Sequence, residues 1–301
     1  QGYHGSQDYD LCLRFTEHSQ QIYHIPKILY HWRILEDSTA INTESKSYAY
    51  DASEKAVQDA LDRRGKGARV YPMSRKNYPG HYRVRYPLKN EPRVSIILID
   101  IFGENKLDTL NNVMLEFAAK TNYDNLEFVI SLSTAEYKKW TQNKETLKSN
   151  KKLDFTVIAS EKNQFSKSVN AAVSAATGAF IAIINPDLKI YSSRWVQIMV
   201  SRLQQPGVSV VGPKILNHDK SLYSAGLVLR RDAPPMHSHM GHPKRSMGYF
   251  GQLGIACNCS ALSIDFLVTS RHLFEEFGQL DENLSSPYTE TDFCLRLSEK
   301  G

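Results

Sequence analysis

Four short runs rich in apolar residues, separated by segments with helical spacing, constrain the fold of this chain more than any other feature. The runs lie at residues 94–99, 127–130, 155–158 and 180–184, and they predict buried strands. Apolar residues recur at helical spacing over residues 107–118, 166–176 and 195–203. Strands that alternate with helices predict an α/β fold, in which a mostly parallel sheet is flanked by helices. Ligands of such a sheet bind beyond the carboxyl ends of its strands.

Length and composition exclude little. The chain has 301 residues, enough for one large domain or two ordinary ones, and 41% of them are hydrophobic. The net charge of +5 is carried by scattered Lys and Arg residues rather than by a block. We therefore expect an anionic small molecule or an acidic membrane surface as the partner, and no nucleic acid. No run reaches the ~20 apolar residues that a membrane span needs.

The termini and the cysteines allow two further expectations. The chain begins with Gln1 and ends at Gly301 directly after a helical pattern, so we expect a fragment. The four cysteines are Cys12, Cys257, Cys259 and Cys294. Their spacing is poor for a zinc site and favours buried, reduced thiols in a cytosolic protein.

An acidic motif occurs near both ends of the chain. Residues 8–14 read Asp-Tyr-Asp-Leu-Cys-Leu-Arg, and residues 290–296 read Glu-Thr-Asp-Phe-Cys-Leu-Arg. Both copies continue into a polar helical pattern, and such self-similarity predicts two homologous domains. We assign residues 1–60 to the C-terminal part of a first domain. Residues 92–301 then form a second domain that is truncated at its C-terminus.

The segment between the two copies is expected to be a connection. Residues 48–64 carry Ala52, Ala56, Ala60 and Leu61 on one side, which predicts a helix that Gly65 ends. Prolines are frequent from residue 72 to residue 92, and they predict a linker or an edge strand. Residues 61–91 are therefore assigned to the linker.

Asp187 directly follows the fourth predicted strand, where an α/β sheet places its ligand. A carboxylate there could hold a divalent cation that bridges the phosphates of a nucleotide. The alternative is a turn without a functional role, because Asn185-Pro186-Asp187 consists of residues that are common in turns.

Glu290 and Asp292 are the acids of the second motif copy, and Asp8 and Asp10 are those of the first. Acids at the start of a helix commonly cap it and suit its dipole. Side chains two residues apart on a helix diverge, however, so one acid could face a cavity while the other caps. A carboxylate in a cavity could accept the proton of an attacking hydroxyl.

Histidines lie in two other segments. His237, His239 and His242 are close together in the segment 232–251, which favours a mobile basic loop over an acceptor or phosphate more than a metal site. His31 follows the strand-like residues 22–29, and it could be a ligand contact or a buried, hydrogen-bonded histidine.

Together these segments resemble the GT-A fold of the family 2 glycosyltransferases, in particular tandem-domain bacterial polysaccharide enzymes of the rhamnan type. The resemblance is carried by residues 6–33 and 37–40, by residues 82–97 at the entry to the second domain, and by a third set. That set comprises Phe165-Ser166, Asn170-Ala171-Ala172, Asn185-Pro186-Asp187, Gly248-Tyr249-Phe250-Gly251 and residues 281–296.

The resemblance implies a role for each of these acids. An acidic triplet after a central strand holds a divalent cation, Mn²⁺ or Mg²⁺, and the donor diphosphate. Asp187 stands at its last position and is the implied metal ligand. Asn170, Asn185, Asp187 and Asp292 are the implied nucleotide-sugar contacts. The catalytic base maps onto Glu290, and onto Asp8 in the first copy, and the implied transfer is inverting.

Two stretches depart from the family pattern. Ile99-Asp100-Ile101-Phe102 stands where the family has Pro-Thr and polar residues, which makes Asp100 the candidate replacement contact with the nucleotide. Residues 131–134 stand where an Asp follows the second strand. These departures support an alternative, a degenerate GT-A domain that binds acceptor glycan or supports a catalytic partner domain. A purely structural α/β domain is the third possibility.

The resemblance also implies the partners. The donor is a UDP- or dTDP-linked sugar, transferred as a hexosyl or rhamnosyl group to a glycan or lipid-linked glycan in cell-surface polysaccharide synthesis. We expect a cytoplasmic protein and leave peripheral association with the inner face of the cell membrane open.

Overall fold

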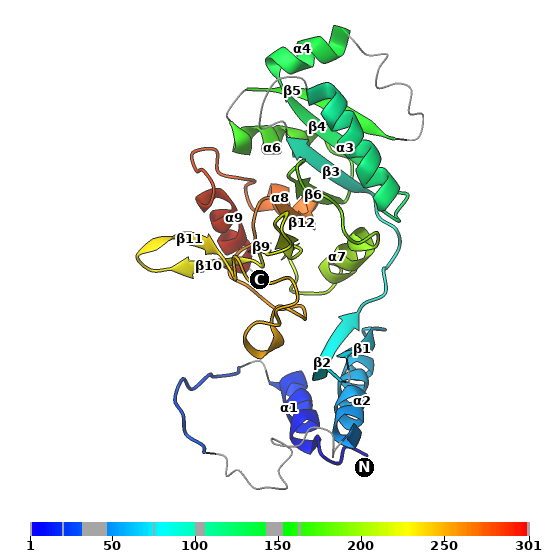
Figure 1. Cartoon of the computed structure of the whole chain (residues 1–301), viewed down its shortest axis with the longest axis vertical. Helices are drawn as coiled ribbons and strands as arrows, with labels where there is room; N and C mark the ends of the chain where they lie inside the picture. The colour runs from blue at the N-terminus through cyan, green and yellow to red at the C-terminus, as the bar shows by residue number, and fades with distance from the viewer. Residues whose placement is uncertain are drawn as a thin grey trace. The chain divides into compact units, whose positions relative to one another are not determined.

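A computed structural model describes residues 2–19, 21–31, 47–74, 76–99, 106–142, 153–161 and 164–299 (Figure 1). The chain divides into two compact units. The first unit comprises Gln1–Pro87 and Met247–Ala256, and the second comprises Leu88–Ser246 and Cys257–Gly301. Asp100 lies outside the described residues.

The first unit contains two helices and a β-hairpin. Its elements are α1 (Gln7–His18), α2 (Ser47–Arg63), β1 (Arg69–Ser74), β2 (Tyr78–Arg85) and the 3₁₀ turn η1 (Tyr249–Gly251). The predicted helix at residues 48–64 is confirmed as α2, and its four predicted apolar residues are all buried. Residues 22–29, which looked strand-like, form no strand.

Most of the segment assigned to the linker folds as the antiparallel hairpin of β1 and β2. The hairpin is attached to α2 because the Tyr82 hydroxyl donates a hydrogen bond to the Tyr50 carbonyl at 2.7 Å. The division between the two units falls after Pro87.

The second unit is built on a sheet that confirms the predicted fold class. Its strands are β3 (Val94–Ile99), β4 (Leu126–Ser133), β5 (Phe155–Ser160), β6 (Phe180–Ile184), β7 (Val210–Val211) and β12 (Phe266–Ser270). Their order is β5-β4-β3-β6-β12-β7. The strands β3 to β6 are parallel, and β12 runs antiparallel to β6 and β7. The four predicted strands are β3 to β6, although β4 continues through Ser133 rather than ending at Ile130.

Helices cover both faces of this sheet. The second unit contains α3 (Lys106–Lys120), α4 (Thr134–Gln142), α6 (Phe165–Ala175), α7 (Trp195–Leu203), α8 (Arg271–Glu276) and α9 (Tyr288–Glu299). Apolar residues of α3 and α7 pack on one face, and those of α6, α8 and α9 pack on the other. Alternate residues of β3 serve the two faces, since Ile96 belongs to the first core and Ile97 to the second.

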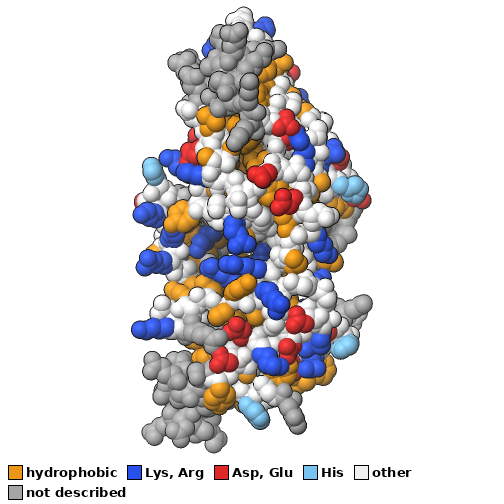
Figure 2. Space-filling model, turned by 90° about the vertical axis from the view of Figure 1, so that its right-hand side faces the viewer, with side chains coloured by type: hydrophobic (Ala, Val, Ile, Leu, Met, Phe, Trp, Pro, Cys, Tyr) orange, Lys and Arg blue, Asp and Glu red, His pale blue; other side chains and the backbone are white. Residues whose placement is uncertain are grey.

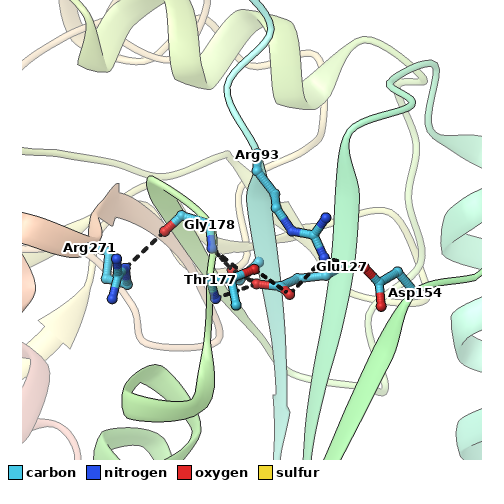
Figure 3. A network of polar contacts seen from close by, with 7 residues as sticks. Arg93, Glu127, Asp154, Thr177, Gly178 and Arg271 are labelled. Atoms are coloured by element: carbon cyan, nitrogen blue, oxygen red, sulfur yellow. Dashed lines mark hydrogen bonds and ion pairs between the residues drawn. The ribbon is translucent and has the colours of Figure 1, made fainter.

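A buried carboxylate joins the strands at the amino edge of the sheet (Figure 3). Glu127 accepts hydrogen bonds from Ser95, Thr177 and the Gly178 amide, and it pairs with Arg93 at 3.0 Å. Burial alone would raise the pKa of Glu127, but these donors outweigh it and bring the pKa to about 2. The network therefore fastens β3, β4 and the turn before β6 to one another.

Two short hairpins lie beyond the sheet. One is formed by β8 (Ile215–Leu216) and β9 (Leu222–Ser224), the other by β10 (Leu227–Arg230) and β11 (Ala233–His237). The segment 232–251 is thus not one loop, because β11 occupies its start.

The expectation of buried thiols is wrong for most of the cysteines. Cys294 is buried in α9, whereas Cys12, Cys257 and Cys259 are exposed, and all four are free. Cys12 lies on an exposed side of α1. Cys257 and Cys259 lie just after Ala256, where the second segment of the first unit ends.

The surface is mildly basic. On the face shown in Figure 2, Lys and Arg side chains gather more densely than Asp and Glu side chains, in keeping with the net charge of +5. Among the described residues, no helix is both long enough and apolar enough to cross a membrane.

Candidate functional site

Asn185, Pro186 and Asp187 form a turn where β6 ends at the carboxyl edge of the sheet. The Asn185 side-chain oxygen accepts the Asp187 amide at 3.0 Å, which closes the turn. The carboxylate of Asp187 is exposed. The turn alternative is therefore correct for the backbone, and it leaves Asp187 accessible to a ligand at the predicted edge.

Asp265 is the neighbour of this turn and was not predicted from the sequence. It directly precedes β12, whose antiparallel pairing sets Phe266 opposite Ile184, so Asp265 lies at the carboxyl edge of the parallel strands. Its carboxylate accepts hydrogen bonds from the Asn185 amide at 2.9 Å and the Ser263 hydroxyl at 2.8 Å. Only the reversed direction of β12 brings this acid to the site.

Glu290 lies in the first turn of α9 and is 1% exposed. One carboxylate oxygen accepts a hydrogen bond from Ser286 at 2.7 Å, and the other has no hydrogen-bond partner among the described residues. Burial raises the pKa of Glu290, and the nearby charge of Asp265 raises it further, against the opposing bond from Ser286. An unpaired, buried carboxylate oxygen is costly for stability and is typical of a functional group.

Tyr223 and His237 complete the cluster from β9 and β11. Their rings lie 4.4 Å apart between centroids. Burial and a hydrogen bond to Asp265 raise the pKa of Tyr223 to about 12, and Glu290 adds to the shift. Burial lowers the pKa of His237, whose Nδ1 is buried without a partner in the described part of the chain. We call Asn185, Tyr223, His237, Asp265 and Glu290 the carboxyl-edge cluster.

Asn170 and Asp292 are tied into the fold. The Asn170 amide exchanges hydrogen bonds with the backbone of Leu280 at 2.9 and 3.1 Å and donates to Glu282 at 3.2 Å. Asp292 pairs with Arg296 at 2.8 Å on the side of α9 away from Glu290. The two acids of the motif therefore diverge as predicted, but Asp292 holds an arginine rather than capping the helix.

Asp8 lies in the first unit, exposed on α1, and its carboxylate accepts the amide of Tyr9 at 2.8 Å. The structure gives it no place in the carboxyl-edge cluster, all of which belongs to the second unit.

No ready-made metal cage is formed by the described residues, among which no group of three or more His, Cys, Asp or Glu side chains is arranged to hold an ion. His239 and His242 contact each other at 5.3 Å between ring centroids, and the Ser238 hydroxyl lies 2.5 Å from His239 Nδ1. The role predicted for these histidines, in a basic loop over an acceptor or phosphate, stays a prediction.

The carboxyl edge of the sheet combines two kinds of carboxylate. A mostly parallel sheet ends in a turn with an accessible carboxylate, beside a buried carboxylate that has a raised pKa.

The fold is shared with solved glycosyltransferases of the GT-A type. The mannosyltransferase PcManGT from Pyrobaculum calidifontis, in complex with GDP-Man and Mn²⁺, superimposes with a TM-score of 0.51 at 14% identity, over 85% of this chain and 63% of that one. GalNAc-T7 with UDP, GalNAc and Mn²⁺ gives a TM-score of 0.51 at 12% identity, over 76% of this chain and 44% of that one.

The sequence comparisons give the family. The sequence model described as "Glycosyl transferase family 2" matches residues 97–273, more than half of the chain. The chain belongs to glycosyl transferase family 2, and it is a glycosyltransferase by family.

Two curated relatives match the whole chain. Protein y4gI of Sinorhizobium fredii is 32% identical, and the O-antigen biosynthesis protein RfbC of Myxococcus xanthus is 26% identical. Each match covers 100% of this chain but only 33% and 23% of the respective relative. The chain therefore spans about a third of the length of one and a quarter of the other.

Proposed function

We propose that the second unit transfers a sugar from a nucleotide-sugar donor to a hydroxyl of a glycan acceptor, with Glu290 as the general base. The observation that carries this proposal is the buried, unpaired carboxylate oxygen of Glu290 in the carboxyl-edge cluster. A general base works best when its pKa is moved toward the operating pH, and burial beside Asp265 moves the pKa of Glu290 in that direction.

The proposed step is a single inverting displacement. The free carboxylate oxygen of Glu290 accepts the proton of the acceptor hydroxyl while the hydroxyl oxygen bonds to the anomeric carbon. The bond from that carbon to the diphosphate oxygen breaks, and the nucleoside diphosphate leaves with the electron pair. Asp265, whose carboxylate is held by Asn185 and Ser263, acts on the base through its charge, which raises the pKa of Glu290.

A divalent cation, Mn²⁺ or Mg²⁺, fits the residues present only as a partner of the substrate phosphates. Asp187 offers one exposed carboxylate, and Asn185 is engaged by its neighbours. Such ions are commonly held by one or two carboxylates together with phosphate oxygens and water. The cation would neutralise charge on the leaving diphosphate.

The remaining proposed residues are contacts with the nucleotide sugar. Asp187 and Asn185 lie at the edge where a donor would bind, and Asp100 keeps its proposed role next to the described end of β3. Asn170 and Asp292 would act by holding the loop before α9 and α9 itself, given the bonds that engage them.

The biological setting is proposed from the relatives. One of them is named for O-antigen biosynthesis, which supports a polysaccharide pathway and a glycan or lipid-linked glycan acceptor. A UDP- or dTDP-linked donor carrying a hexose or rhamnose, a cytoplasmic location and peripheral contact with the inner membrane complete the proposal.

Thermal unfolding with nucleotides tests donor binding. The chain is mixed with Mn²⁺ and, in turn, UDP, dTDP and GDP. A ligand at 100 times its dissociation constant stabilises the folded state by ~2.7 kcal/mol, which is a readily measured rise in Tm. We expect Asp187→Ala to abolish the metal-dependent rise and Asp124→Ala, an exposed acid at the opposite edge of the sheet, to preserve it.

One observation favours a second candidate, a GT-A unit that binds glycan without catalysis. Asp187 is the single acid of its turn, and Asn185 is engaged by its neighbours. For that candidate, no nucleoside diphosphate raises the Tm in the presence of Mn²⁺, whereas an acceptor glycan does.

A further inference from the structure

Helix α1 packs against its neighbour with its polar face. Ser6 donates a hydrogen bond to the Ala49 carbonyl at 2.7 Å, and Glu17 pairs with Arg63 at 2.7 Å. Asp10 is buried on the same side of the helix. An amphipathic helix normally turns its apolar stripe inward, so α1 has the reverse orientation.

The opposite face of α1 is apolar and exposed. Leu11 is 54% exposed and Phe15 is 65% exposed, and Cys12 lies beside them. Phe15 follows Leu11 by four residues and Cys12 by three, so all three lie on one side of the helix and form one stripe. The segment that follows adds further exposed large side chains, namely Ile22, Tyr23, Ile25, Ile28, Leu29 and Tyr30. We call the stripe and this segment the α1 surface, and an apolar patch of this kind marks an interaction site.

The second motif copy shows what such a helix contacts. By the repeat, Leu11, Cys12 and Phe15 correspond to Phe293, Cys294 and Leu297 of α9. Those three are 0%, 3% and 3% exposed, packed in the second unit. Phe293 lies 5.2 Å from Phe274 of α8 between ring centroids, and its core includes residues of β6 and β12. The apolar residues of the motif are therefore buried in α9 and exposed in α1.

The arginine of the motif repeats this contrast. Arg14 and Arg296 each pair with the aspartate four residues earlier, at 2.8 Å. Arg296 also donates to the Phe277 and Gln279 carbonyls at the end of α8, where the helix dipole is negative. Arg14 contacts the side chains of Asp10 and Tyr3, and no backbone carbonyl of the described residues accepts a hydrogen bond from it. The remaining donors of its guanidinium could therefore bind the carbonyls at such a helix end.

We propose that the α1 surface docks onto a further family 2 glycosyltransferase core, one that has no last helix of its own. The partner would present an apolar sheet face and the carbonyls of a helix C-terminus, as β12, β6 and α8 do for α9. A second copy of this chain does not fit, since its equivalent position is filled by its own α9. Relatives three to four times as long as the match have room for such a core within one polypeptide.

Thiol labelling tests the proposal. The 301-residue chain and the complete product of its gene are treated with N-ethylmaleimide, and each cysteine is followed by mass spectrometry. In the chain alone, Cys12 should react as fast as the exposed Cys257. In the complete protein, Cys12 should react at least tenfold more slowly, approaching Cys294. Equal reactivity of Cys12 in both proteins would overturn the proposal.

A matched pair of substitutions provides a second readout. Phe15→Asp should leave the Tm of the 301-residue chain unchanged and lower that of the complete protein by several degrees. Val228→Asp changes an exposed apolar residue of β10 outside the α1 surface and should have no effect in either protein. A Phe15→Asp variant that lowers the Tm of both proteins equally would show that α1 is needed only by the first unit.

Discussion

At the scale of single residues, Glu290 combines a cost for stability with a proposed chemical role. Its buried carboxylate has a raised pKa, so the ionised form is penalised in the folded state. Glu290→Gln keeps the shape and removes the charge. We expect nucleotide binding to persist, transfer to fall by at least a hundredfold, and the Tm at pH 7 to rise. A donor-transfer assay beside calorimetry measures both effects.

The pH dependence shows whether the higher Tm of Glu290→Gln comes from the loss of the buried charge. The pKa of Glu290 is raised in the folded protein, so its protonated form favours folding, and stability is lost as pH rises from the ordinary value of 4.5 toward the raised pKa of the folded state. The advantage of Glu290→Gln should therefore disappear below pH 4.5. Transfer that survives in this variant would remove Glu290 as the base.

Asp265 is expected to tune Glu290. Its charge raises the pKa of Glu290, so Asp265→Asn should lower that pKa and shift the acidic limb of the kcat/KM profile to lower pH. The same variant should lower the pKa of Tyr223, which Asp265 also raises. A rate loss with an unmoved pH profile would leave Asp265 a structural role alone.

At the scale of elements, the sequence was informative where burial sets the pattern. The strands β3 and β6 and the helix α7 have the predicted bounds, because most of the side chains that each one buries are apolar. The hairpin strand β11 was hidden, since its sequence Ala-Pro-Pro-Met-His contains two prolines that normally exclude a strand. Asp265 was hidden for another reason, because its importance depends on the antiparallel direction of β12, which no local pattern encodes.

The repeated helix motif gives a prediction at this scale. Arg296 pairs with Asp292 within α9, and it joins α9 to the end of α8 through the Phe277 and Gln279 carbonyls. Arg296→Ala removes all of these bonds. We expect a loss of about 2 kcal/mol in the free energy of unfolding, measured with urea. Arg14→Ala is the matched variant on α1 and should cost much less in the same chain. Equal losses would mean that the carbonyls of α8 contribute nothing.

At the scale of the whole molecule, the two edges of the sheet have different roles. The amino edge is closed by Glu127 and its donors, and every contact there joins one strand or turn to another. The carboxyl edge carries the exposed Asp187 and the unpaired oxygen of Glu290. A fold can tolerate buried polar atoms without hydrogen bonds at one edge of its sheet when the polar groups at the other edge are hydrogen-bonded. This is the expected division between stability and function.

This division predicts how the second unit unfolds in acid. The pKa of Glu127 is lowered from 4.5 to about 2, so its stabilisation is complete above 4.5 and is lost as pH falls toward 2. Glu127→Gln should cost about 3 kcal/mol at neutral pH, because it leaves Arg93 without its buried partner. The difference from the unmodified chain should shrink as urea unfolding is repeated at pH 4 and pH 3. Asp154→Asn, which changes the exposed partner of Arg93, is the control and should cost far less. A difference that stays constant down to pH 3 would show that packing, rather than the charge of Glu127, holds the amino edge together.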